Sequence, residues 1–362
     1  MKVLLASPGL GMGGAERVVL QLAAGLTERG HRVTVSGATG PLEDELAGLG
    51  VERLVLPERG RSAPGALAAV AALARLIRRT RPDVVHGHNV KASLLAATAA
   101  RAAWPTARAR LVSTFHGVVP GEYRAAAHLL RSVDAVACVS ADLVDGLRAA
   151  GYPAERLVLV HTAVATPPPL LPQEREALDA ELGLGDTAVV LAIGRLVAQK
   201  NHMRLLEAVA LTRPAPGAVR YLVAGDGALR GPLQRRAVEL GVQDRVRFLG
   251  LRRDTRALVQ RADVLVFSSD WEGLSIAALE GLAAGTPIVT TPVEGMKVLL
   301  GDQAAGVISP DMSAAHLAAA LTALVEDPAQ RARMGRAGRE LVASSFALER
   351  MLDQYEALYR RR

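Results

Sequence analysis

Short runs of apolar, often β-branched residues alternate along the whole chain with longer stretches in which apolar residues recur at helical spacing. Such alternation predicts βαβ units and parallel sheets. In the first half, helices are predicted over 15–29 and 66–80. The predicted strands of this half are 2–6, 31–36, 53–56, 83–86, 110–115, 134–139 and 157–160.

A proline-rich stretch interrupts this pattern. Four of the seven residues of 166–172 are proline, which continues neither a helix nor a central strand, so we predict a stiff linker here. The alternation then restarts, with predicted strands at 187–193, 219–224, 246–249, 263–267, 286–290 and 306–309. The fold class is therefore α/β, with two doubly wound, Rossmann-like domains facing each other across a cleft.

The domain bounds follow from the linker and from the tail. We expect one domain over 1–165 and a second over 166–346, since 362 residues exceed the usual size of a single core. The tail, 347–362, has apolar side chains at helical spacing and predicts a helix that crosses back to the first domain.

Composition narrows the setting. Half of the residues are hydrophobic, enough for two cores, and Cys138 is the single cysteine, which excludes an intramolecular disulfide and fits a reducing compartment. No stretch is long and apolar enough to predict a membrane span, and the N-terminus does not resemble a signal peptide. We therefore expect a soluble, cytoplasmic protein.

The net charge of +7 is concentrated in the first half of the chain. Residues 1–165 have 19 Lys and Arg against 13 Asp and Glu. Such a basic face suits anionic lipid headgroups or an acidic acceptor, although an arginine-rich, solvated helix face is the favoured explanation. Nucleic acid is disfavoured because aromatic residues do not alternate with the cations. The arginines that lie close together are Arg59, Arg61, Arg75, Arg78, Arg79 and Arg81.

Two carboxylates eight positions apart give the clearest chemical signal. Glu272 lies in a loop that follows the predicted strand 263–267, and Glu280 lies inside the helix that this loop opens. Loops at the carboxyl ends of parallel strands bind ligands in α/β proteins, and a helix start attracts phosphate. The spacing therefore suits a phosphate bridge between two hydroxyl-bearing ends, as in a nucleotide sugar.

Two cations in the same domain fit the same ligand. Arg195 and Lys200 follow the first predicted strand after the linker, where they would neutralise a diphosphate. No Asp-x-Asp occurs in the chain, so we expect no metal on the phosphates. A zinc set of His86, His88 and His116 is disfavoured because no further ligand has suitable spacing.

A glycine-rich turn raises a rival function. Gly9, Gly11 and Gly14 fit the G-x-G-x-x-G pattern of dinucleotide-binding proteins, which is typical of an NAD-dependent oxidoreductase. That function needs an acidic residue near the end of the second strand, and none occurs there before Glu43. The glycines still imply that backbone or ligand approaches closely.

Taken together, these motifs resemble the retaining glycosyltransferases of family 4, which have the GT-B fold. The matching motifs occur in family order and extend from residue 9 to about 292. They are Gly13-Gly14-Ala15-Glu16-Arg17, Thr114-Phe115-His116-Gly117, Gly194-Arg195 with Lys200, Gly225-Asp226-Gly227, and Glu272-x7-Glu280.

The resemblance implies a role for each matched residue. Arg195 and Lys200 would stabilise the leaving diphosphate, and Glu272 and His116 would contact the donor sugar. The residues assigned to donor and nucleotide binding are Gly14, Gly194, Gly225, Gly273, Leu274, Ser275 and Glu280. The run 291–297 departs from the family pattern, which leaves Glu294 and Lys297 without a role.

The implied function is transfer of a hexose-type sugar from a nucleotide-diphosphate donor, most commonly a UDP-sugar, to a glycan or lipid-linked acceptor. No cofactor is expected. A GT-B-fold nucleotide-sugar epimerase and a non-catalytic sugar-nucleotide-binding protein are the alternatives to this transferase, beside the oxidoreductase.

Overall fold

The structure is a computed structural model in which residues 1–11, 13–56, 63–104, 108–118, 121–213, 217–301 and 304–361 are described. The chain divides into two compact units, Met1–Ala163 with Leu348–Arg362, and Val164–Ala347. These bounds differ by one or two residues from those expected from the linker and the tail. Arg59 and Arg61 of the basic stretch lie outside the described residues.

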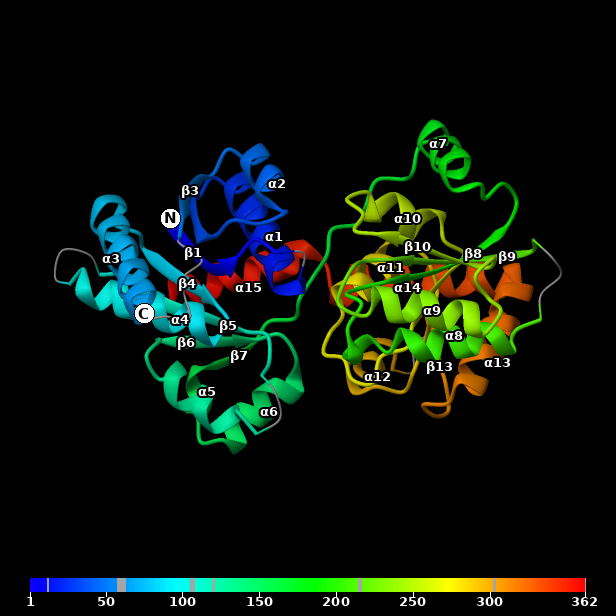
Figure 1. The fold of residues 1–362 in the computed structure, drawn as a ribbon. Coiled ribbons are helices and arrows are strands. Elements are labelled where there is room, and N and C mark those ends of the chain that lie inside the picture. Colours follow the sequence, from blue (N-terminus) through cyan, green and yellow to red (C-terminus); the bar gives the residue numbers. More distant parts are fainter. Residues whose placement is uncertain are drawn as a thin grey trace. The chain divides into compact units, whose positions relative to one another are not determined.

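The first unit is built on a seven-stranded parallel sheet with the order β3-β2-β1-β4-β5-β6-β7 (Figure 1). Every predicted strand is present, with ends shifted by a few residues. The strands are β1 (Lys2–Gly9), β2 (Arg32–Ala38), β3 (Glu52–Val55), β4 (Val84–His88), β5 (Arg110–Phe115), β6 (Ala135–Cys138) and β7 (Leu157–Leu159).

Helices cover both faces of this sheet. Val85 packs with Leu73 of α3, whereas His86, the next residue of β4, bonds to Tyr359 of α15. Successive strand residues face opposite sides, so α3 and α15 cover opposite faces. The helices are α1 (Gly14–Glu28), α2 (Glu43–Gly48), α3 (Ala63–Thr80), α4 (Val90–Ala102), α5 (Tyr123–Leu130), α6 (Ala141–Ala149), the short η1 (Ala154–Arg156) and α15 (Leu348–Arg360).

The tail helix α15 is part of the first unit. Leu352 packs so closely on α1 that a Cβ at Gly25 would lie 2.4 Å from its side chain. Arg29 forms ion pairs with Glu349 and with Asp353, the latter at 2.7 Å. The amphipathic tail therefore completes the core of the unit in which the chain begins.

The second unit has a six-stranded parallel sheet with the order β10-β9-β8-β11-β12-β13. Strands β9 and β10 lie on one side of β8, and β11, β12 and β13 lie on the other, so the chain reverses direction across the sheet between β8 and β11. The strands are β8 (Ala188–Ile193), β9 (Val219–Ala224), β10 (Val246–Gly250), β11 (Val264–Phe267), β12 (Ile288–Thr290) and β13 (Gly306–Ile308).

The strands of this unit are apolar on both sides because helices cover both faces. Val189 and Leu191 pack with Leu279 of α11, whereas Val190 packs with Leu205 of α8. The helices are α7 (Pro172–Leu182), the short η2 (Ala198–Lys200), α8 (His202–Leu211), α9 (Arg230–Glu239), α10 (Thr255–Arg261), α11 (Ile276–Ala284), α12 (Glu294–Leu300), α13 (Ala314–Glu326) and α14 (Pro328–Ser345).

The proline-rich linker is shorter than predicted. Pro172 is the first residue of α7, a position that proline tolerates because the first helical N–H needs no partner within the helix. The predicted strand 286–290 is also shorter, since β12 begins at Ile288, directly after Pro287. A proline has no N–H to donate to the sheet, which explains why pairing begins after it.

Candidate active site

The predicted site residues of the second unit lie around the carboxyl ends of β8 and β11, whereas Gly14 belongs to the first unit, at the start of α1. These strands are neighbours with Val264 opposite Val190, and the chain reverses direction across the sheet between them. In doubly wound sheets this switch point is where ligands bind. The loop after β8 includes Arg195 and Lys200, and the loop after β11 includes Glu272.

Lys200 and Glu272 are direct partners. The Lys200 ammonium donates a hydrogen bond to Glu272 Oε1, and Ser269 Oγ donates to the same oxygen at 2.7 Å. The side chain of Lys200 is only 16% exposed and that of Glu272 only 7%. A half-buried ion pair with a further hydrogen bond holds both charges in fixed positions.

A second set of hydrogen bonds joins the loop after β8 and the start of α8 to the loop after β11. The Asp270 carboxylate accepts hydrogen bonds from the Asn201 side-chain amide at 3.0 and 3.2 Å and from Arg204 at 2.7 Å. Arg204 also donates to the Ser268 carbonyl at 2.6 Å, and Ser268 Oγ donates to the Lys200 carbonyl at 3.0 Å. The loops after β8 and β11 are therefore held together on both sides of Lys200.

Burial and these hydrogen bonds act in opposite directions on Asp270. Burial raises its pKa, but the hydrogen bonds from Asn201 and Arg204 outweigh this and keep the pKa below its usual value. Asp270 is therefore ionised near neutral pH. Sequence motifs did not single out Asp270 or Arg204, although both stand within four residues of matched positions.

Arg195 is exposed and follows Gly194 at the end of β8. A Cβ at Gly225 would lie 1.9 Å from the Gly194 carbonyl oxygen, and its φ of +145° is one that side chains disfavour. Glycine is required there because the loops after β8 and β9 touch through their backbones. Gly225 therefore shapes the loop that presents Arg195 and Lys200.

The helix α11 begins at the same place. Ser275 is its N-cap, with Oγ accepting from the Ala278 amide at 3.4 Å. Gly273 has open space beside it, and Leu274 packs against the core of the unit. Glu280 is the fifth residue of α11 and is half-buried.

The run that departs from the family pattern supports the Glu272 loop. The Gly295 amide donates to the Glu272 carbonyl oxygen at 3.1 Å. A Cβ at Gly295 would lie 2.1 Å from the Gly273 carbonyl oxygen. Glu294 and Lys297 are a solvent-exposed pair 3.9 Å apart. Gly295 is thus the residue of this run that bears on the site.

In the first unit, the glycine turn leads from β1 into α1. A Cβ at Gly13 would lie 2.4 Å from Oε2 of Glu16, and the nearest atom to a Cβ at Gly11 also belongs to Glu16. The close approach that the glycines implied is therefore, at Gly13, to an acidic side chain of the same helix. A carboxylate at this helix start opposes a pyrophosphate, which argues against dinucleotide binding.

His116 directly follows β5 and is part of a row of three neighbouring histidines. His88 Nδ1 and His116 Nε2 are 3.3 Å apart, and their ring centroids are 5.6 Å apart. His86 lies against His88, with 4.4 Å between the ring centroids. The rings of His88 and His116 are stacked, whereas those of His86 and His88 are tilted by 35°. Within the described residues no group of three or more His, Cys, Asp or Glu could hold a metal ion.

Burial keeps these histidines neutral. It lowers the pKa of His86 to about 3 and of His116 to about 4, and it lowers the pKa of His88 well below its usual range. In the second unit, burial and then the charge of Lys200 lower the pKa of His202 to about 4. Burial also raises the pKa of the Cys138 thiol to about 12, which makes this cysteine inert.

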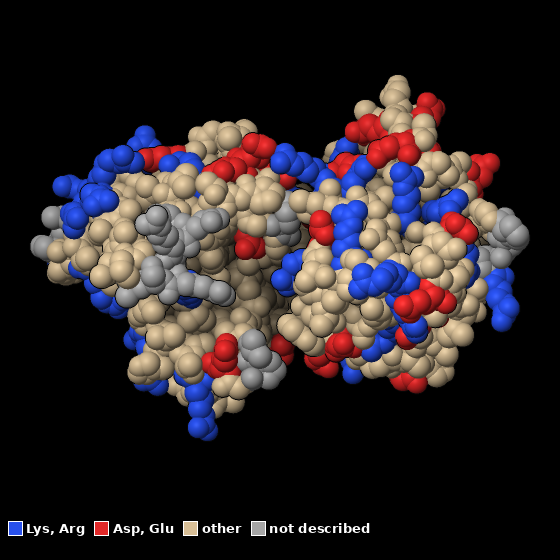
Figure 2. Space-filling model, viewed as in Figure 1, with Lys and Arg blue, Asp and Glu red and all other residues tan. Residues whose placement is uncertain are grey.

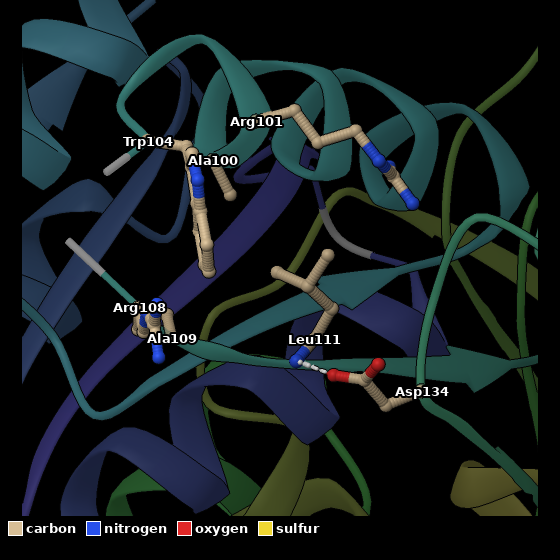
Figure 3. Close-up of a pocket in the computed structure, with 7 residues that line it drawn as sticks. All are labelled: Ala100, Arg101, Trp104, Arg108, Ala109, Leu111 and Asp134. Carbon is tan, nitrogen blue, oxygen red and sulfur yellow. Dashed lines mark hydrogen bonds between the residues drawn. The ribbon is translucent and has the colours of Figure 1, made fainter. Parts of the chain in front are cut away.

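A hollow of about 450 Å³ lies in the first unit, at the edge of the sheet opposite to His116 (Figure 3). It is lined by residues at the end of α4 and the start of β5, including Trp104, Arg108 and Leu111. The amino ends of the strands form this edge of the sheet, whereas the glycine turn and His116 follow carboxyl ends. The Arg108 guanidinium lies 4.4 Å from the centre of the Trp104 ring.

No helix of the described chain is long and apolar enough to cross a membrane.

Comparison with known families agrees with this arrangement. A family model described as "Glycosyltransferase Family 4" matches residues 12–166, and one described as "Glycosyl transferases group 1" matches residues 174–341. The two matches correspond closely to the two units.

Similar proteins are also glycosyltransferases. The lipopolysaccharide core biosynthesis glycosyltransferase LpsE of Rhizobium meliloti is 29% identical over 360 residues, which cover 95% of this chain and 94% of that protein. The alpha-D-kanosaminyltransferase of Streptomyces kanamyceticus is 31% identical over 242 residues, which cover 64% of this chain and 62% of that protein.

Solved structures show the same fold. Anabaena HepE in complex with UDP-glucose has a TM-score of 0.85 at 24% identity, covering 99% of both chains. WaaG, a glycosyltransferase involved in lipopolysaccharide biosynthesis, has a TM-score of 0.75 at 19% identity, covering 99% of this chain and 100% of that one. The chain is therefore a glycosyltransferase with the GT-B fold.

Proposed function

We propose that the protein is a retaining glycosyltransferase of family 4, which moves a hexose-type sugar from a UDP-sugar to a glycan or lipid-linked acceptor of the cell envelope. The observation that carries this proposal is the placement of Lys200, Glu272 and the start of α11 at the switch point between β8 and β11. Cations and the backbone amides of a helix start bind a diphosphate, and a carboxylate accepts hydrogen bonds from the hydroxyls of a sugar.

The proposed chemistry needs stabilisation of charge on the departing diphosphate. As the sugar–phosphate bond breaks, negative charge grows on the phosphate and positive charge grows on the sugar. Arg195, Lys200 and the amides at the start of α11 would stabilise the anion, each by a few kcal/mol, and Glu272 would orient the sugar. We propose that protein cations take this role without a metal ion.

Retention of configuration is the stereochemical part of the proposal. The acceptor would attack from the side on which the diphosphate leaves, and a phosphate oxygen would take its proton. The sugar–phosphate bond breaks, the new glycosidic bond forms, and UDP leaves with the proton. His116 would contact the transferred sugar and Glu280 the ribose hydroxyls.

The acceptor class rests on the relatives. LpsE is named for lipopolysaccharide core biosynthesis, and HepE has been solved with UDP and glucose. These names support an envelope glycan or glycolipid acceptor and a UDP-sugar donor. A location in the cytoplasm at the inner face of the membrane would give access to both substrates.

Peripheral contact with an anionic membrane is part of the same proposal. Arg78 donates to the Ala102 carbonyl at 3.1 Å, which brings the basic end of α3 beside the end of α4, where Trp104 is 56% exposed. Figure 2 shows Lys and Arg gathered on this end of the first unit. An exposed tryptophan among arginines suits a headgroup region. Binding to phosphatidylglycerol vesicles that weakens in Arg75→Glu/Arg78→Glu would support this contact, and equal binding to neutral vesicles would contradict it.

The deciding experiment is a thermal-shift panel of nucleotide sugars followed by product analysis. A donor at 100 times its Kd raises the free energy of unfolding by about 2.7 kcal/mol. The donor that shifts the melting temperature is then incubated with acceptor glycans, with and without EDTA, and the anomeric configuration of the product is read by NMR. Inverted product would contradict retention, and EDTA-sensitive transfer would contradict the metal-free mechanism. Isomerisation of the donor without acceptor would instead favour an epimerase.

A further inference from the structure

His88 is a buried histidine to which neither the sequence motifs nor the proposed chemistry gives a role. It ends β4, has no exposed surface, and lies between the rings of His86 and His116. Its Nδ1 atom is 3.3 Å from His116 Nε2. Its other ring nitrogen, Nε2, is buried and has no hydrogen-bond partner among the described residues.

This pattern of partners determines which nitrogens are protonated. Each neutral imidazole has one N–H donor and one bare acceptor nitrogen. If His116 donated to His88, the proton of His88 would be on Nε2 and would be a buried N–H without a partner. If His88 donates instead, the group without a partner is a bare nitrogen, and unpaired buried acceptors are less rare than unpaired buried N–H groups. The second arrangement is therefore favoured.

The ring of His88 is held in place by the tail helix. The ring of His86 lies against it, tilted by 35°, and both nitrogens of His86 are occupied, by Tyr359 Oη and by Thr114 Oγ1, each at 2.7 Å. Tyr355 Oη bonds to the same Thr114 oxygen at 2.7 Å. Two bonds to opposite sides of the ring prevent His86 from turning, so His88 rests on a rigid surface.

We propose that His88 is a positioning residue that fixes both the orientation and the tautomer of His116. The His88 Nδ1–H donates to His116 Nε2, so that His116 has its proton on Nδ1. His116 thereby offers an N–H donor to a ligand oxygen, and the ligand is the transferred sugar if the proposed function holds. All three rings are neutral near pH 7 because burial lowers their pKa values.

Ring nitrogen NMR tests the tautomers without any substrate. Protein labelled with 15N in its histidine rings is examined by long-range 1H–15N correlation at pH 7.5, and His88→Asn and His116→Asn are used to assign signals. We expect protonated Nδ1 and bare Nε2 for both residues. A proton on His116 Nε2, or an even mixture of both tautomers, would overturn the proposal. Absence of transfer activity with every donor would defeat the proposed function and leave this result valid.

Two amide variants test the positioning role. The Asn side chain places an amide nitrogen near the site of Nδ1, whereas the Gln amide reaches the site of Nε2. We expect His88→Asn to keep most of the activity, and His88→Gln and His88→Phe to lower kcat by roughly tenfold to a hundredfold. The surface variant His128→Phe of α5 is the matched control and should keep full activity.

The pattern across these variants separates positioning from packing. A similar loss in the Asn, Gln and Phe variants, with the control unaffected, would mean that His88 only fills space, and would overturn the proposal. Full activity in all three would also overturn it. If His88→Phe fails to fold, the comparison of Asn with Gln, together with the NMR of the unmodified protein, still decides.

Discussion

The backbone amide of Gly295 donates a hydrogen bond to the carbonyl oxygen of Glu272 at 3.1 Å. This contact brings the start of α12 so close to the Glu272 loop that a Cβ on Gly295 would lie 2.1 Å from the Gly273 carbonyl oxygen. The loop that holds Glu272 therefore packs against Gly295, and a larger residue would not fit there.

Gly295→Ala should therefore displace the Glu272 loop. We expect weaker donor binding and a kcat lower by about tenfold or more, since small misplacements of reacting groups are costly. Gly231→Ala in α9 is the control, because its Cβ would meet nothing closer than 3.6 Å. Isothermal titration with donor and steady-state kinetics measure the effect. Equal values for both variants would show that the contact does not shape the site.

Lys200→Ala and Arg195→Ala should each lower kcat by at least about 100-fold while the fold is retained. The reason is loss of a positive charge that stabilises the leaving diphosphate. Arg235→Ala, at an exposed position in α9, is the control for removal of a cation from this unit. Steady-state kinetics with circular dichroism measure both properties. Turnover near normal in both variants would refute the assignment.

Glu280→Ala should mainly affect the donor. We expect its KM to rise about tenfold with kcat nearly unchanged, because hydrogen bonds to the ribose hydroxyls are made equally in the ground state and the transition state. The donor KM of Glu280→Gln should lie between those of the unmodified protein and Glu280→Ala, because glutamine keeps one oxygen that can accept a hydrogen bond. The KM for the donor at saturating acceptor is the measurement. An unchanged value would place the ribose elsewhere.

Asp270→Asn should loosen the connection between the loops after β8 and β11. Arg204 would lose its ion pair, and the hydrogen bonds to a charged group would weaken, at a cost of roughly 1.5–3 kcal/mol in free energy of unfolding. We expect kcat to fall about tenfold as well, because Lys200 lies within these loops. Urea denaturation and kinetics are compared with the exposed control Asp244→Asn. A double-mutant cycle with Arg204→Ala that shows no coupling would contradict the structural role.

Acid should destabilise the protein from about pH 6.5 downward. The pKa values of His86, His116 and His202 fall from 6.5 to about 3, 4 and 4 on folding, so the unfolded chain binds protons in this range that the folded chain does not. The free energy of unfolding therefore decreases as the pH is lowered, by up to about 1.4 kcal/mol per pH unit for each histidine. Urea denaturation between pH 7.5 and 5 measures the slope.

The variant His202→Met isolates one of these histidines. Both of its ring nitrogens are buried without partners among the described residues, so an apolar side chain of similar size should be tolerated at pH 7.5. Below pH 6.5, the slope of the free energy of unfolding against pH should decrease by the contribution of about one proton. An unchanged slope would show that His202 is already charged in the folded protein.

The strands and the motif residues could be predicted from the sequence because they depend on local patterns. Runs such as Ala188–Ile193 are apolar at every position, which is typical of a strand covered on both faces. The glutamates and cations of the donor site lie directly after such strands, and the topology brings these loops together.

The contacts that hold the site could not be predicted in this way. Thr114 and Tyr355 are 241 residues apart, and His86 and Tyr359 are 273 residues apart. No local pattern links them, and only the packing of α15 shows that they meet. Sequence spacing alone raises the three histidines as a metal set, whereas the structure shows His88 stacked on and hydrogen-bonded to His116, and His86 bonded to Tyr359 and Thr114.

The position of α15 also determines when the first unit is completed during synthesis. The chain leaves this unit after Ala163 and returns to it at Leu348, and the two crossings pair with each other at Val164 and Ala347. The ribosome therefore makes the entire second unit before it makes Tyr355 and Tyr359. Until then, His86 and Thr114 have no hydroxyl partners from the tail. Completion of the first unit must therefore wait for α15, so truncation before Leu348 should leave this unit without part of its core.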